Sequence, residues 1–211
     1  FNEITANSMD AVSDRDYIVE FLASASLCIM HLSRLAEEII LWSSVEFNFL
    51  QIGTQWTTGS SIMPQKRNPD YAEITRGKTG RIYGNLIALL TTLKGLPLTY
   101  NRDLQEDKEG LFDTHTTLLA TCEVMNGMLK DSQFNTSRMS AAAEDSSLLA
   151  TDFADYLVAK GLPFREAHSI VSNLCDLATE EKVSIINLTL DTLLEYSSLF
   201  SEDIYEITPL A

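Results

Sequence analysis

The apolar positions of this chain recur at steps of three and four residues along most of its length, the period of a helix packed on one face. Ser13 and Asp16 form a capping-box pattern that predicts the start of a first long helix. From there the apolar steps fall at Ile18, Phe21, Ala25, Cys28, Leu32, Leu35, Ile39 and Trp42. A heptad seam of this length predicts that the helix packs against a partner helix.

A second helix is predicted after a proline. Asn68 can cap it with its side-chain oxygen, and Pro69 suits the first helical position. Glu73 places negative charge where the helix dipole favours it. We expect this helix to end near Lys94, because Gly95 follows.

Three glycines interrupt the second helix, at Gly77, Gly80 and Gly84. Glycine costs a helix about 1 kcal/mol relative to alanine. Their presence therefore predicts close approach of the backbone to neighbouring helices.

A third helix is predicted after a short connection, with Asp103 and Glu106 as a cap pair. Its seam runs through Leu111, His115, Leu118, Cys122, Met125 and Leu129. Three long helices joined by short turns predict an antiparallel bundle. The length of the seams suggests that the bundle also packs against other subunits.

The helical pattern breaks between Phe134 and Asp145, where small and polar residues accumulate. We place a domain boundary there. The predicted fold is all-α, with a helical bundle over 1–140 and a smaller, truncated helical domain over 141–211. In the second domain helices are expected at 148–159, at 163–181 and from Asp191 onward. No strand alternation is convincing.

Acidic residues outnumber basic ones by 30 to 15, which gives a formal charge of −15. This balance argues against nucleic acid or an anionic membrane as a partner. No apolar run approaches the roughly 20 residues needed to span a bilayer. The odd number of cysteines, each in an apolar helical pattern, predicts buried thiols and neither disulfides nor a metal site. A reducing, cytoplasmic location is expected, although an organelle stays open.

The loop at 58–70, within Thr58–Glu73, carries the clearest chemistry of the chain. It contains a glycine followed by Ser60 and Ser61, and then Lys66 and Asn68. A hydroxyl, a cation, an amide and loose backbone N–H groups suit a site that grips a carboxylate and moves a proton. The alternative is a basic surface loop before a helix.

The string GSSIMPQKRNP resembles the signature of the fumarase/aspartase superfamily, G-S-S-x-M-P-x-K-x-N-P. The resemblance implies an all-α homotetramer that cleaves a C–N or C–O bond by β-elimination. A second string, LKGLPLTYNRDLQEDKEGLFD, resembles argininosuccinate lyases and their lens relative, delta-crystallin. The resemblance covers nearly the whole chain and weakens after about Lys182.

By this resemblance, Ser60 is the catalytic serine and Ser61 its supporting neighbour. Lys66 and Asn68 hold the carboxylates of the succinyl group. Glu73 supports a catalytic histidine, and it is equally well explained as a first-turn acid. The remaining substrate contacts are Tyr100, Gln105 and Lys108. We expect Gln105 and Lys108 to share a helix face because they are three residues apart.

The resemblance implies cleavage of argininosuccinate to arginine and fumarate, without cofactor or metal, in active sites shared between subunits. The assisting histidine is expected outside this chain. His31 and His115 are read as core or interface residues, His168 as a helix-face residue and Arg15 as a surface ion-pair partner. A structural delta-crystallin-like protein, another lyase such as adenylosuccinate lyase, and a fragment inactive by itself are the alternatives.

Overall fold

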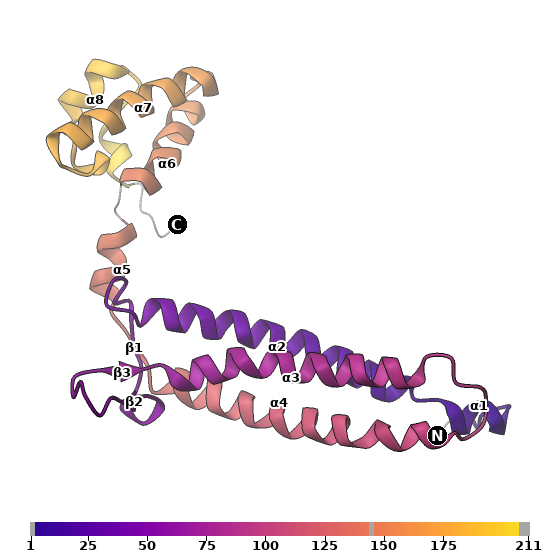
Figure 1. Cartoon of the computed structure of the whole chain (residues 1–211). Coiled ribbons are helices and arrows are strands. Elements are labelled where there is room, and N and C mark those ends of the chain that lie inside the picture. The colour runs from indigo at the N-terminus through magenta and orange to yellow at the C-terminus, as the bar shows by residue number, and fades with distance from the viewer. Residues whose placement is uncertain (1–2, 144–145, 207–211) are drawn as a thin grey trace. The chain divides into compact units, whose positions relative to one another are not determined.

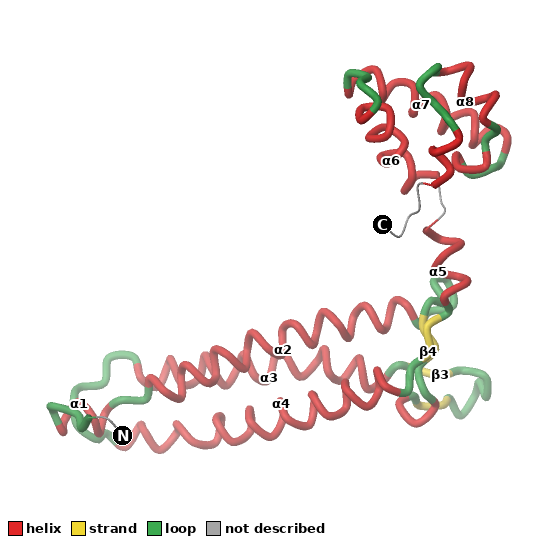
Figure 2. Tube along the Cα trace, turned by 180° about the vertical axis from the view of Figure 1, so that it is seen from behind, coloured by secondary structure: helices red, strands yellow, loops and turns green. Residues whose placement is uncertain are grey.

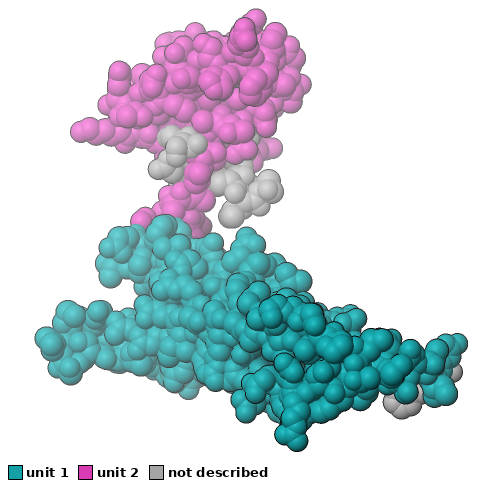
Figure 3. All heavy atoms as spheres, turned by 45° about the vertical axis from the view of Figure 1, so that its right-hand side comes forward, with its two compact units in different colours: residues 1–135 teal, residues 136–211 magenta. Residues whose placement is uncertain are grey.

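The computed structural model describes residues 3–143 and 146–206. The chain divides into two compact units, Phe1–Asn135 and Thr136–Ala211 (Figure 3). The first unit contains the loop at 58–70 and all the candidate site residues.

The first unit is an antiparallel bundle of three long helices (Figure 1). A short helix α1 (Ser8–Ser13) precedes α2 (Asp16–Trp42), α3 (Asp70–Leu93) and α4 (Asp107–Lys130). The end of α3 follows the prediction, since Gly95 takes a left-handed conformation at φ +69° just beyond it. The all-α fold predicted from the periodicity is confirmed.

The predicted caps of the three long helices do not form. Ser13 ends α1 and donates a hydrogen bond to the Asp10 carbonyl, so it does not cap α2. Asn68 lies in a strand, and Pro69 is the N-cap of α3 with no side-chain hydrogen bond. Asp103 lies in a 3₁₀ helix, η2 (Arg102–Glu106), which leads directly into α4. At the start of α2 the acceptor is instead the Asp14 carboxylate, which accepts a hydrogen bond from the Asp16 N–H at 2.8 Å.

The buried face of the bundle differs from the predicted seams. On α2 the seam residues Ile18, Ala25 and Ile39 are buried, but Cys28 is exposed and Ile29 is buried beside it. On α4 the buried positions are Asp107, Thr114, Thr117, Thr121, Met125 and Met128. His115, Cys122 and Leu129 of the predicted α4 seam are exposed. Met125 of the same predicted seam is buried, and Leu111 and Leu118 are half-buried against the core, so half of the seam faces this chain's own core and half faces away.

The glycines of α3 make no close approach within the described part of the chain. A Cβ placed on Gly77, Gly80 or Gly84 would have open space within 4 Å. Inside one subunit the expectation of close packing is wrong at these positions. The close approach occurs at Gly127 of α4, where a Cβ would lie 2.3 Å from Cζ2 of Trp56.

Short paired segments, which the sequence did not predict, close one end of the bundle. Strand β1 (Leu50–Gln51) pairs antiparallel with β4 (Gln133–Phe134), and β2 (Thr58–Gly59) pairs antiparallel with β3 (Arg67–Asn68). A 3₁₀ turn, η1 (Thr54–Trp56), lies between β1 and β2. Figure 2 shows these strands at the end of the bundle far from α1.

The second unit is a small helical domain. It contains α5 (Thr136–Ala143), α6 (Ser146–Ala159), α7 (Phe164–Glu181), η3 (Ile185–Asn187), α8 (Leu190–Tyr196) and η4 (Glu202–Glu206). These bounds confirm the helices predicted after residue 148. Phe153, Leu157, Leu174 and Ile204 lie at the centre of its apolar core.

Two expectations from composition need correction. Helix α2 is the one helix of the described residues that is long and apolar enough to cross a membrane, although the sequence reading excluded any such run. Core helices of soluble proteins can have the same length and apolar composition, and α2 packs against α3 and α4. The length and composition of α2 are therefore weak evidence for a membrane span. The predicted burial of the thiols is wrong for Cys28 and Cys122, which are exposed, while Cys175 is half-buried.

Candidate functional site

The loop between β2 and β3 holds the first group of candidate residues. The strand pairing sets Thr58 opposite Asn68 and Gly59 opposite Arg67. The pairing ends at Gly59 and Arg67, so Ser60 and Lys66 are the first and last residues of the loop that connects the two strands. The Thr58 hydroxyl donates a hydrogen bond to the Asp70 carboxylate, which ties the loop to the first turn of α3.

The Ser60 hydroxyl oxygen accepts two backbone hydrogen bonds, from the N–H groups of Ile62 and Met63, each at 3.2 Å. Such a turn is typical of serine in a tight loop. Two N–H donors aimed at one oxygen also stabilise negative charge there, as in an oxyanion hole. The geometry therefore fits both a structural cap and a stabilised alkoxide.

The remaining loop residues offer donors toward solvent. Ser61 and Lys66 are exposed, and Asn68 is half-buried. The backbone N–H of Lys66 donates to the Met63 carbonyl at 3.0 Å, which closes a turn at the loop tip. Glu73 is exposed on the first turn of α3, beside the loop.

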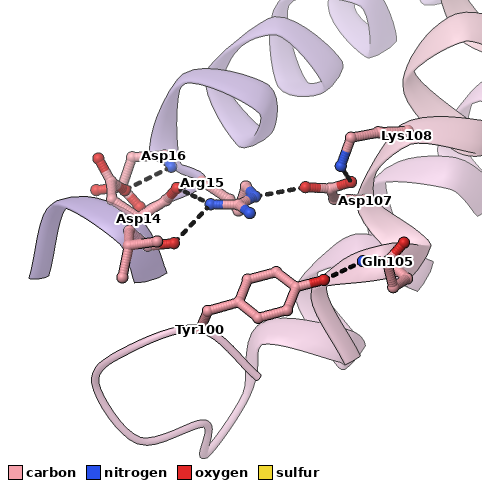
Figure 4. Close-up of polar contacts among 8 residues, drawn as sticks. Asp14, Arg15, Asp16, Tyr100, Gln105, Asp107 and Lys108 are labelled. Atoms are coloured by element: carbon pink, nitrogen blue, oxygen red, sulfur yellow. Dashed lines mark hydrogen bonds and ion pairs between the residues drawn. The ribbon is translucent and has the colours of Figure 1, made fainter. Parts of the chain in front are cut away.

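The second group of candidate residues lies where the segment after α3 meets the start of α4 (Figure 4). The amide Nε2 of Gln105 donates to the Tyr100 hydroxyl oxygen. The Lys108 ammonium contacts Oδ1 of Asp107 at 2.7 Å. Gln105 lies in η2 and Lys108 in α4, so the two residues do not belong to one helix as we expected. Their side chains contact different residues.

Arg15 is an ion-pair partner, but not a surface one. Its Nε donates to Oδ2 of Asp107, and its side chain is 12% exposed. Asp107, which sequence reasoning missed, is 2% exposed. Extending the α4 seam back by four residues from Leu111 reaches Asp107, but the pattern gave no reason to expect a buried carboxylate there.

Asp107 is held in its charged form despite its position. Burial favours the neutral acid, but hydrogen bonds from Lys108 and Arg15 outweigh it and lower the pKa of Asp107 below its ordinary value. Two cations surround one carboxylate, so this cluster carries one net positive charge. Lys108 is the exposed member of the three, and its ammonium can donate to a carboxylate ligand.

The backbone next to Tyr100 is strained. Thr99 has φ +81°, a conformation that a β-branched residue rarely adopts. Its N–H donates to the Met9 carbonyl at 3.0 Å, which joins this loop to α1. Arg15 and Thr99 both line a cavity of about 150 Å³. Strain of this kind is often found at functional sites.

The structure does not bring the two groups together within one chain. The loop at 58–70 lies at the start of α3, whereas Tyr100, Gln105 and Lys108 lie beyond its end (Figure 1). A helix of 24 residues spans roughly 36 Å. Ser60 and Lys108 of one subunit are therefore too far apart to contact one small molecule.

The histidines and acids give no sign of a further reactive cluster in the parts of the chain that the structure describes. His31, His115 and His168 are all exposed, so a core role for the first two is wrong within this chain. Among residues 3–143 and 146–206, no group of three or more His, Cys, Asp or Glu side chains could hold a metal ion.

Comparison with known proteins identifies the family of this chain. A family model described as lyase matches residues 1–84, and one described as argininosuccinate lyase C-terminal matches residues 147–211. Argininosuccinate lyases of Bacillus cereus and Lactococcus lactis subsp. cremoris are each 56% identical over 207 residues, which is 98% of this chain. The chain belongs to the argininosuccinate lyase family. It spans 45% of the length of these relatives.

Solved structures of helical lyases share the fold. An EDDS lyase in complex with formate aligns with a TM-score of 0.82 and 28% identity, over 98% of this chain and 43% of that chain. A class II fumarase from Schistosoma mansoni aligns with a TM-score of 0.66 and 19% identity, over 99% of this chain and 44% of that chain. The EDDS lyase structure contains a bound carboxylate, formate.

Proposed function

We propose that this protein cleaves argininosuccinate to arginine and fumarate by β-elimination. The 56% identity to curated argininosuccinate lyases, held over 98% of this chain, carries the proposal. Two clusters of carboxylate-binding groups in one bundle support it. The relevant pathway is arginine biosynthesis, and we place the enzyme in the cytoplasm.

In the proposed reaction a base removes a proton from the carbon beside a carboxylate of the succinyl group. The bond from the neighbouring carbon to the guanidinium nitrogen breaks, the electron pair leaves with that nitrogen, and the double bond of fumarate forms. The carbon acid is weak, so stabilising the charge-rich intermediate is the main task of the site.

Ser60 is the proposed base. A serine hydroxyl is a poor base unless its alkoxide is stabilised. The two N–H groups at 3.2 Å from the Ser60 oxygen supply part of that stabilisation, and the cation of Lys66 in the same loop supplies more.

The other candidate residues take the substrate's charged groups in this proposal. Lys66 and Asn68 hold the carboxylates of the succinyl end, Ser61 supports Ser60, and Glu73 orients a catalytic histidine. The substrate also meets Tyr100, Gln105 and Lys108. The reaction as proposed uses no metal and no cofactor.

The enzyme is proposed to be a homotetramer. Large apolar side chains are exposed along all three long helices: Tyr17, Leu27, Leu41, Ile74, Tyr83, Ile87, Leu90, Phe112, Leu119 and Leu129. Exposed apolar surface on this scale marks an interface. A neighbouring chain that covers it would also bring its Lys108 toward Ser60 of the first chain.

Two alternatives would give different results in one assay. A delta-crystallin-like structural protein would bind or ignore argininosuccinate without turnover. Another lyase, such as adenylosuccinate lyase, would act on a different substrate, and the segment from Tyr100 to Lys108 argues against it. The full-length protein is mixed with argininosuccinate while the ultraviolet absorbance of fumarate is recorded. Rising absorbance with release of arginine is expected, and its absence would refute the proposal.

A further inference from the structure

Asp107 and Lys108 form an ion pair although they are consecutive residues of the chain. Neighbouring residues on a helix point in different directions and do not normally pair. The Lys108 ammonium nevertheless bends back to Oδ1 of Asp107 at 2.7 Å. Because both residues belong to α4, this contact joins no separate elements.

The other half of the cluster does join elements. Arg15 precedes α2, and its Nε donates to Oδ2 of Asp107 at the start of α4. Its Nη1 donates to the carbonyls of Asp14 and Val12, at 2.6 and 3.1 Å. Arg15 is thus fixed at several points and in turn fixes the Asp107 carboxylate.

Accessibility separates the roles of the two cations. The Arg15 side chain is 12% exposed and Asp107 is 2% exposed, whereas Lys108 is 59% exposed. Of the two cations, Lys108 is therefore the one whose charged group is positioned to meet a ligand. The nearby carboxylate of Asp14 is occupied, since it accepts a hydrogen bond from the Asp16 N–H at 2.8 Å.

We propose that Asp107, fixed by Arg15, is a positioning residue that holds the Lys108 ammonium for a carboxylate of the substrate. This rests on the proposed function. A free lysine side chain must lose considerable rotamer freedom on binding. Contact with a buried, immobile carboxylate removes part of that freedom before the substrate arrives, and Arg15 neutralises Asp107 so that the site keeps its positive charge.

The test is a mutant cycle in the full-length enzyme. Asp107→Asn keeps the size of the side chain and removes its charge, and Lys108→Met removes the ammonium. Asp107→Asn removes the charge-assisted hydrogen bond between residue 107 and the Lys108 ammonium. This loss should raise KM about tenfold, with a smaller change in kcat. If Asp107 acts through Lys108, Asp107→Asn should add little to KM when Lys108→Met is already present.

Two further variants distinguish a raised KM caused by the lost contact from one caused by a folding defect. Asp107→Asn leaves Arg15 buried without a counter-charge, so Arg15→Gln with Asp107→Asn makes a neutral buried pair that should fold and still show the raised KM. Asp113 lies on α4, as Asp107 does, and forms a more exposed ion pair with Arg81 of α3. Asp113→Asn breaks that pair and should lower stability without changing KM.

Each outcome decides one question. An unchanged or lower KM in Asp107→Asn and in the double variant, with only the melting temperature reduced, would overturn the positioning role. Fully additive effects of Asp107→Asn and Lys108→Met would also overturn it. If the wild-type enzyme releases no fumarate from argininosuccinate, the proposed function itself fails, and this inference with it.

Discussion

The indole ring of Trp56 lies directly against Gly127, so that a Cβ on Gly127 would overlap the ring at 2.3 Å. Trp56 Nε1 also donates to Oδ2 of Asp131 at 2.7 Å, just beyond the end of α4. Trp56 ends η1, two residues before β2 begins. The glycine thus allows the segment that leads into the loop at 58–70 to dock on α4.

Gly127→Ala should therefore lower both stability and activity. We expect a loss of about 1–3 kcal/mol in the free energy of unfolding, as in other overpacked sites. Denaturant unfolding measures the loss, and tryptophan fluorescence reports the displaced ring. Adding Trp56→Leu should recover part of the stability by making room for the methyl group. A stability increase in Gly127→Ala, as helix propensity alone would give, would contradict the packing seen here.

Ser60→Ala should lower kcat at least ~100-fold while substrate still binds, since general acid–base groups contribute this much. Ser60 also accepts two backbone hydrogen bonds, so the alanine variant disturbs the turn as well. Ser60→Asn is the matched control, because asparagine can form the same turn without a hydroxyl. Both variants should be inactive in steady-state assays. Activity in Ser60→Asn would mean that Ser60 only shapes the loop.

Lys66→Met should reduce kcat/KM by about 2–4 kcal/mol in transition-state free energy, the scale of one lost donor to a developing charge. Arg67→Met removes the neighbouring exposed cation of the same loop and should have a much smaller effect. Steady-state kinetics on both variants makes the comparison. Equal losses would indicate that the loop acts through its total charge and not through Lys66.

Subunits carrying Ser60→Ala, mixed with subunits carrying Lys108→Met, should partly recover activity. The two residues lie beyond opposite ends of α3, so the proposed active site would take them from different chains (Figure 1). Some sites in a mixed tetramer then contain neither substitution. The subunits are exchanged by denaturation and refolding, and mixing is verified by a mass difference. Mixed tetramers that stay as inactive as the parents would refute a shared site.

Acid should weaken the second unit through Asp203. The hydroxyl groups of Tyr156 and Ser201 and the ammonium of Lys160 donate to this carboxylate and lower its pKa to about 2. A lowered pKa in the folded state stabilises the protein above the ordinary value of 3.8, and this contribution disappears as the pH falls toward 2. Asp203→Asn should therefore destabilise η4 at neutral pH, and the difference from wild type should shrink in acid.

Hydrogen exchange of the η4 amides, compared between Asp203→Asn and wild type at neutral pH and again in acid, measures this difference in stability. Asp152→Asn changes an exposed acid of the same unit and is the control, with little effect expected at either pH. A pH-independent difference for Asp203→Asn would show that lost packing, and not lost charge, accounts for the effect.

The sequence by itself determined most of the helices and the family. The steps of three and four residues indicated a helix up to Trp42, where α2 ends, because helical periodicity is a local property of the chain. Gly95 marked the end of α3, because glycine readily takes the left-handed conformation that ends a helix. The string around Ser60 indicated the family because so many residue types are specified there.

The tertiary structure alone decided which faces are buried and which site residues meet. Cys122 and Leu129 belong to an apolar seam, yet they are exposed, while Thr117 and Thr121 are buried beside them. Periodicity shows that a helix has an apolar face but not which helix covers it. The burial of Asp107 depends on Arg15, which lies 92 residues earlier in the chain. The separation of Ser60 from Lys108 follows from the length and direction of α3, which become positions in space only when the bundle is assembled.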